Sequence, residues 1–309
     1  MTLTGFVLLY IVATIAIGVI AATRVKNTSD FALAGRSLPL PMVITATFAT
    51  WFGSETILGL PGRFIESGIA GVIEEPFGSG MALILVGTFF AHKLYKQNIL
   101  TLGDYYRDRY GRSVELLCSV AIVISYLGWV GAQVTALGLV INLITEGAVS
   151  MTTGMVIGAA VVLAYTMVGG MWSVAMTDFV QMIVIVVGLV AILWFATDLA
   201  GGMDKVVDYA RGRDLFHAFP EPTTTGWLFW ISAAMTMMIG SIPQQDVFQR
   251  VMSAKNLPTA VAGPILGGSF YILFAFVPMF IVVAAILVMP DAAEKMLSED
   301  PQQLLPTLV

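Results

Sequence analysis

Residues 50–62 read TWFGSETILGLPG and place a carboxylate, Glu55, inside what otherwise looks like one continuous hydrophobic helix. Gly53 costs about 1 kcal/mol of helix propensity relative to alanine, and the Pro-Gly pair near the end of the stretch weakens it further. A helix interrupted within a membrane exposes backbone carbonyls, which proteins tolerate only where they line a cavity. The stretch therefore predicts a broken helix at a functional site. The alternative is that Glu55 pairs with a buried partner and only locks helices together.

The composition makes the lipid bilayer the solvent for most of the chain. Of 309 residues, 58% are hydrophobic and 11% are charged, and the mean hydropathy is +0.88. A soluble domain carries about 25% charged residues. The net charge of −5, without a Lys/Arg block, disfavours a nucleic-acid partner. The single cysteine, Cys118, excludes an intramolecular disulfide.

Hydropathy predicts eight membrane-spanning helices, since about 20 apolar residues suffice to cross the hydrocarbon. The first is a span and not a cleavable signal, because no basic region precedes it. The eight stretches are roughly 5–22, 41–60, 69–91, 115–145, 152–169, 174–198, 227–248 and 259–289.

The loops predict that the amino terminus faces outside. Ten basic residues follow spans one, three and seven, against five in the alternate loops. Cytoplasmic loops carry the excess of Lys and Arg. We expect four parts along the chain: the first helix and a basic cytoplasmic loop, spans two to six, an extracellular loop, and spans seven and eight with an extracellular tail. Their respective bounds are 1–40, 41–198, 199–226 and 227–309.

Ionisable groups within spans cost about 2.5–3.5 kcal/mol at the bilayer centre and by default mark a pathway or site. Glu55, Asp178 and Asp246 fall in this class. We interpret Glu74 and Glu75, which precede a proline at the outer interface, as solvated headgroup residues. Trp51 and Trp129 lie within spans, where they either pack or cage a quaternary ammonium group. Uncharged polar companions in the spans are Ser54, Thr56, Gln133, Gln181, Gln244 and Gln245.

Four functions are considered as explanations of this pattern of residues. A cation-coupled transporter explains both the broken helix and the buried carboxylates, because freed carbonyls can coordinate a cation. An intramembrane hydrolase is disfavoured, because the spans contain no HExxH and no Ser/His or Asp/Asp arrangement. A sensor module would require a soluble signalling domain after residue 309. A channel would require a filter-like repeat. We expect a transporter and not an enzyme.

Five motifs together resemble the sodium:solute symporter family, and the resemblance runs along essentially the whole chain. It implies a leucine-transporter-like, five-helix inverted-repeat core of all-α transmembrane type, with one helix ahead of it. Spans two to six would form the first repeat. Family members continue for about five more helices, so we expect about 8 of 13 helices here. The motifs are SDFALAGRSLP (29–39), GSETILGLPG (53–62), TLGDYYRDRYG (101–111), YTMVGGMWSVAMTDFVQ (165–181) and PQQDVFQRVMSAKN (243–256).

The resemblance also implies a sodium site. The carbonyls of Ala49 and Phe52 match positions that bind sodium in the family, and Asp178 matches an aspartate implicated in sodium binding or release. The helix that supplies the hydroxyl ligands would follow Val309. We read the chain as a cut-off product, with a natural eight-span protein as the alternative.

The resemblance also implies a substrate site, but this chain departs from family members at two of its positions. Asp246 stands where sugar-transporting members have a gating tyrosine, and Gln244 stands where choline-transporting members have a third cage tryptophan. The substrate-binding residues that we expect are Trp51, Ser54, Glu55, Thr56, Trp129, Gln133, Gln244, Gln245 and Asp246.

We therefore predict a multi-pass protein of the inner (plasma) membrane that couples Na+ to the symport of a small polar organic solute by alternating access. The solute would be choline-like, an amino acid or a sugar. Its other partner is the lipid bilayer, with no nucleic acid involved. The alternative is the membrane sensor module of a symporter-like signalling protein.

Overall fold

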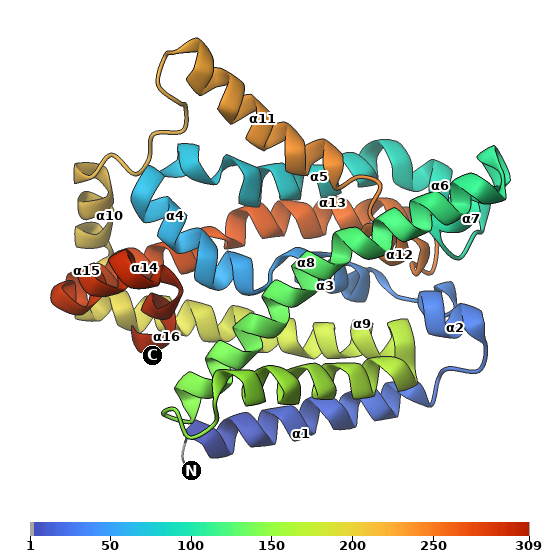
Figure 1. The fold of residues 1–309 in the computed structure, drawn as a ribbon, viewed down its shortest axis with the longest axis horizontal. Helices are drawn as coiled ribbons and strands as arrows, with labels where there is room; N and C mark the ends of the chain where they lie inside the picture. The colour runs from blue at the N-terminus through green and yellow to red at the C-terminus, as the bar shows by residue number, and fades with distance from the viewer. Residues whose placement is uncertain (1–2, 309) are drawn as a thin grey trace. The chain divides into compact units, whose positions relative to one another are not determined.

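The computed structural model describes residues 3–308, and over this range the chain is helical, with one isolated parallel bridge between Leu38 and Ala254 (Figure 1). The elements, in chain order, are α1 Leu3–Ala22, α2 Thr28–Leu33, η1 Ala34–Arg36, α3 Leu40–Trp51, η2 Glu55–Gly59, α4 Leu60–Ser67, η3 Ile69–Val72, η4 Ile73–Gly78, α5 Ser79–Leu85, η5 Val86–Phe90, α6 Ala91–Gln97, α7 Leu102–Tyr110, α8 Arg112–Ile144, α9 Met151–Leu199, α10 Met203–Gly212, α11 Thr224–Gly240, α12 Gln245–Met252, α13 Leu257–Phe274, α14 Phe276–Val288, α15 Pro290–Glu299, η6 Pro301–Gln303 and α16 Leu304–Leu308.

Among the described residues, five helical segments are long and apolar enough to cross a membrane. The count rises to six when α11 and α12, which are bent by 46° at their junction, are taken as one span. The predicted count of eight differs for two local reasons. The stretches 152–169 and 174–198 are counted together as α9, although Gly170 interrupts that element, and the stretch 41–60 is divided into short helices. The all-helical membrane architecture follows the hydropathy.

Gly170 reverses the chain inside α9, where its φ of 51° and ψ of −139° are not helical. A Cβ at this position would lie 2.3 Å from the carbonyl oxygen of Phe31, so no side chain fits. The arm before the reversal lies beside α1 in Figure 1. A Cβ on Gly18 would meet Tyr165 at 2.7 Å, and the Ser173 hydroxyl donates to the Gly18 carbonyl at 2.5 Å.

The second predicted span is broken where the sequence places Gly53. Helix α3 ends at Trp51, and the chain resumes as a π-helical turn, η2, and then as α4. Non-helical residues at this depth leave backbone groups without their regular partners. The predicted interruption is therefore present, and it lies immediately before Glu55.

The chain divides into two compact units that interleave along the sequence. Unit 1 comprises Met1–Thr47, Val86–Gln181 and Pro243–Ile265, and unit 2 comprises Phe48–Leu85, Met182–Ile242 and Leu266–Val309. Segments far apart in the sequence pack together in each unit, and the four sequential parts expected from the hydropathy stay a prediction. The assignment of spans two to six to one repeat stays a prediction.

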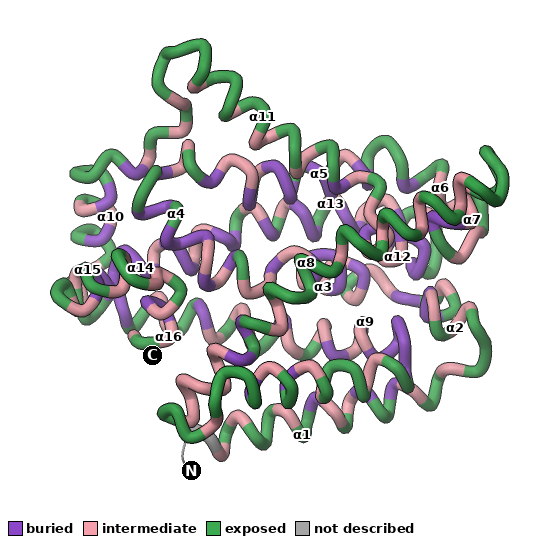
Figure 2. Tube along the Cα trace, in the orientation of Figure 1, coloured by how far each residue is buried: buried purple, intermediate pink, exposed green. Residues whose placement is uncertain are grey.

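Unit 1 has a small hydrophobic core and a group of contacts around Arg36 and Tyr95, which we call the Arg36–Tyr95 cluster. Its core consists of Leu33, Leu102, Phe248 and Met252. The Arg36 guanidinium stacks 4.0 Å from the Tyr95 ring and donates to the Tyr95 carbonyl at 2.6 Å. The Tyr95 hydroxyl donates to the carbonyl of Ala254 at 2.8 Å. These contacts join η1 to α6, and α6 to the segment after α12. Most of α8, which also belongs to this unit, is exposed in Figure 2.

Unit 2 has the larger core, built around α14, in which eight of the residues from Pro278 to Ile286 are buried. The segment 199–226, which was expected as an extracellular loop, contains helix α10, with Val206 and Ala210 buried against this core. Near the carboxyl end, Leu304 is fully buried, and a Cβ on Gly62 would lie 2.8 Å from Pro301. The chain after α14 thus returns to the helix that follows the break.

Candidate functional site

The break in unit 2 changes the backbone hydrogen bonding at a position that the family resemblance implies for sodium. In a regular helix the N–H of Gly53 would bond to the carbonyl of Ala49. Instead it bonds to the carbonyl of Trp51 at 2.9 Å. The hydrogen bond from Gly53 that the Ala49 carbonyl would accept in a regular helix is therefore absent. Phe52, the other expected carbonyl ligand, lies in the break itself, and its side chain is 3% exposed.

Three buried polar side chains meet directly after this break. The Thr56 hydroxyl oxygen lies 3.0 Å from Glu75 Oε1, 3.0 Å from the Tyr271 hydroxyl and 3.1 Å from the Trp51 carbonyl. The Tyr271 hydroxyl also donates to Glu75 Oε1. These groups come from η2, η4 and α13, and their exposed fractions are 0%, 4% and 0%. We call Thr56, Glu75 and Tyr271 the polar triad.

The interpretation of Glu75 as a solvated headgroup residue is wrong. Its side chain is enclosed and bonded to two hydroxyls, whereas that of its neighbour Glu74 is 38% exposed and lies 4.0 Å from Arg63. Of the predicted substrate residues, only Thr56 belongs to the triad. Two signals in the sequence point to the missed members: the second carboxylate of the pair before Pro76, and the one tyrosine in the apolar span 259–289.

Glu55 occupies a different environment from the one the sequence suggested. Its carboxylate pairs with Arg63, one helical segment later, at 2.7 Å, and both side chains are 44% exposed. An ion pair with that exposure contributes about 0–1 kcal/mol of stability. The buried carboxylate of this region is therefore Glu75 and not Glu55.

An aromatic wall lies against the triad. The Phe48 and Phe52 rings stack at a centroid distance of 4.8 Å, and each meets the Tyr271 ring edge-on at 6.3 Å. Three buried polar atoms of this unit have no hydrogen-bond partner among the described residues: the indole nitrogens of Trp51 and Trp230 and the Ser79 hydroxyl. Buried polar groups are nearly always paired. Trp51, a predicted substrate residue, therefore keeps an unused donor beside the break.

A second group of predicted residues lies in unit 1. The Tyr126 hydroxyl of α8 donates to Asp246 Oδ1 at 2.6 Å, and the Asp246 N–H donates back to the same hydroxyl oxygen at 3.2 Å. The Trp129 ring, which is 43% exposed, meets the Tyr126 ring edge-on at 6.4 Å. Two predicted residues thus converge on one tyrosine that the sequence analysis did not single out.

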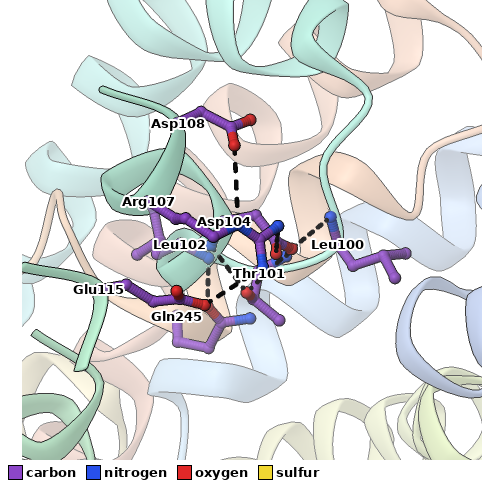
Figure 3. A network of polar contacts seen from close by, with 8 residues as sticks. All are labelled: Leu100, Thr101, Leu102, Asp104, Arg107, Asp108, Glu115 and Gln245. Atoms are coloured by element: carbon purple, nitrogen blue, oxygen red, sulfur yellow. Dashed lines mark hydrogen bonds and ion pairs between the residues drawn. The ribbon is translucent and has the colours of Figure 1, made fainter. Parts of the chain in front are cut away.

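Gln245 is engaged elsewhere in unit 1. Figure 3 shows its side-chain oxygen accepting the N–H of Leu102, at 2.9 Å, at the amino-terminal end of α7. The same end carries a capping box in which Thr101 and Asp104 satisfy each other's backbone N–H groups. This contact holds the start of α12 to α7.

The remaining predicted residues are half-buried. Gln133 lies on α8, Gln244 caps α12, Ser54 lies in the break and Asp178 follows the buried Thr177 on α9. The predicted site residues are divided between the units, with Ala49, Trp51, Phe52, Ser54, Glu55 and Thr56 in unit 2 and Trp129, Gln133, Asp178, Gln244, Gln245 and Asp246 in unit 1.

The profile of the family described as "Sodium:solute symporter family" matches residues 31–309. The high affinity choline transporter 1 of Homo sapiens is 29% identical over 264 residues, which cover 81% of this chain and 44% of that protein. The Drosophila melanogaster high-affinity choline transporter 1 is 28% identical over 282 residues, covering 89% and 44%. Sodium/glucose cotransporter 4 of Danio rerio is 28% identical over 302 residues, covering 90% and 45%.

A solved structure of a Na+-coupled sialic acid symporter, in its substrate-bound outward-open state, has a similar fold. The TM-score is 0.81 at 19% sequence identity, and the match covers 98% of this chain and 63% of that one. The chain spans less than half the length of the curated relatives that it matches.

Proposed function

The chain belongs to the sodium:solute symporter family, and from that premise we propose that it forms part of a sodium-coupled symporter for a small polar organic solute. Family and relatives are transporters and not enzymes. The observation that carries the proposal is the redirected N–H of Gly53, which leaves the carbonyl of Ala49 without that helical hydrogen bond beside the polar triad. Sodium would bind at Ala49 and Phe52, with Asp178 on its path.

The solute would bind next to the same break. The aromatic wall, the unused Trp51 donor and the buried carboxyl of Glu75 together suit a solute with both apolar and hydrogen-bonding or cationic parts. Choline, sugars and amino acids all meet this description. We add Glu75 and Tyr271 to the predicted substrate residues, and we assign Gln245 a positioning role at α7.

Coupling would arise by alternating access in the plasma membrane. A ligand shifts a conformational equilibrium only when it binds the two states with different affinity. The break offers such a difference, because a free carbonyl can exchange a sodium ion for a helical hydrogen bond. Binding of sodium would then keep the helix open for the solute.

Uptake into proteoliposomes tests the proposal. The full-length protein is reconstituted, and uptake of radiolabelled choline, D-glucose and sialic acid is measured under an inward sodium gradient and under an equal potassium gradient. We expect accumulation of one of these solutes with sodium only. Equal uptake under both gradients would refute sodium coupling. Sodium-dependent uptake that is unchanged in Glu75→Ala would show that the triad is not part of the solute site.

A further inference from the structure

The contact between Tyr126 and Asp246 joins two distant parts of unit 1 through a single hydroxyl. Tyr126 lies in the middle of α8, and Asp246 lies 120 positions later in the first turn of α12. The hydroxyl donates to the carboxylate and accepts the backbone N–H of the same aspartate. Both the backbone and the side chain of Asp246 are therefore held by one phenol.

Such a double contact fixes a side chain that would otherwise be mobile. Helix α12 begins after a 46° bend from α11, and the first N–H groups of any helix have no partner within it. The phenol oxygen satisfies one of these groups. Because the same phenol also binds Oδ1, the carboxylate cannot rotate to cap the helix itself.

One side-chain oxygen of Asp246, Oδ1, is held by the Tyr126 hydroxyl. Arg250, four residues later, donates to the backbone carbonyl of Asp246, at 3.2 Å, and not to its carboxylate. The Trp129 ring lies against Tyr126, one helical turn along α8. The Asp246 carboxylate, the Tyr126 hydroxyl and the 43% exposed Trp129 ring thus lie together in unit 1.

We infer that Tyr126 is a positioning residue that holds Asp246 for contact with the cationic or hydrogen-bond-donating group of the solute. The inference rests on the proposed function and assigns a solute contact within it. A carboxylate forms its strongest contacts with charged donors, and an indole face attracts ammonium groups. The pair therefore favours a solute with an ammonium group over a neutral sugar.

The test compares Tyr126→Phe, Asp246→Asn and the double variant in the full-length protein, with Tyr110→Phe as control because Tyr110 is 59% exposed on α7. Choline is the probe, D-glucose is the neutral comparator, and thermal unfolding shows that each variant is folded. Loss of one hydrogen bond to a charged group predicts that Tyr126→Phe raises the half-saturating choline concentration about tenfold, with the maximal rate nearly unchanged. The double variant should be no worse than Asp246→Asn, and the control should behave as the original protein.

Three results would overturn the inference: additive effects of the two substitutions, a fall in maximal rate without a change in half-saturation, or no choline uptake by the original protein. Sodium-dependent uptake of D-glucose together with no uptake of choline would leave the proposed function intact while refuting this contact. A choline-induced thermal shift, measured without any gradient, separates binding from transport. A shift that is lost in Asp246→Asn but is unchanged in Tyr126→Phe would also refute the positioning role.

Discussion

The Thr56 hydroxyl lies 3.0 Å from the Glu75 carboxyl, so the residue that follows Glu55 at the helix break binds a carboxyl from the start of the next predicted span. Tyr271 closes the group from α13. The contact places three chain segments of unit 2 around one buried carboxyl. The geometry of the break therefore depends on the hydrogen bonds that Glu75 accepts.

Glu75→Ala should lower stability as well as uptake. The substitution removes the acceptor that the hydroxyls of Thr56 and Tyr271 share, and each lost hydrogen bond costs about 0.5–1.5 kcal/mol. We expect a fall in the midpoint of thermal unfolding in detergent. Glu75→Gln keeps an oxygen acceptor and is the matched control, so it should recover most of the stability. Equal midpoints for Ala and Gln would contradict the assignment of these hydrogen bonds.

The sequence was sufficient to predict the break but not the triad. Gly53 and the Pro-Gly pair are local signals, and their helix propensity acts within one turn. Glu75 is bonded to residues 19 and 196 positions away, so its burial depends on packing that no local pattern encodes. The same reason accounts for Tyr126, whose partner lies 120 positions away. The family could be predicted from the sequence, because the order of the five motifs along the chain is typical of that family.

Gly170→Ala should unfold or misfold the chain. Its φ of 51° is unfavourable for any residue with a Cβ, and the added atom would lie 2.3 Å from a backbone oxygen. Strain at such positions costs about 1–3 kcal/mol before the clash is counted. Gly188→Ala on the same helix is the control, because a Cβ there has no heavy atom within 4 Å. Monodisperse yield after size-exclusion chromatography should collapse for the first variant and not for the second.

Arg36→Lys should weaken the Arg36–Tyr95 cluster of unit 1. Arg36 stacks on Tyr95 and donates to Asn98 and to the Tyr95 carbonyl through separate nitrogens, which a lysine cannot reproduce. We expect faster proteolysis in the loop after α1. Arg109→Lys provides a control, since Arg109 is exposed on α7. The same cleavage rate for both variants would show that the planar guanidinium of Arg36 is dispensable.

Asp178→Asn should raise the sodium concentration needed for half-maximal uptake without abolishing transport. A carboxylate near an ion path stabilises sodium by direct charge attraction, and losing about 1.4 kcal/mol corresponds to a tenfold change. Asp198→Asn, at an exposed position near the end of the same helix, is the matched control and should leave sodium dependence unchanged.

Gly53→Ala should also raise the sodium concentration needed for half-maximal uptake, but by a different mechanism from Asp178→Asn. Alanine favours helix by about 1 kcal/mol over glycine, so the N–H of residue 53 would return part of the time to the carbonyl of Ala49. The oxygen would then be shared between a hydrogen bond and sodium, and half-saturation should rise about fivefold. Gly59→Ala is the control, because a Cβ there meets only Glu55 Cγ, at an ordinary 3.9 Å. If both alanine variants keep the original sodium dependence, the Ala49 carbonyl is not a sodium ligand.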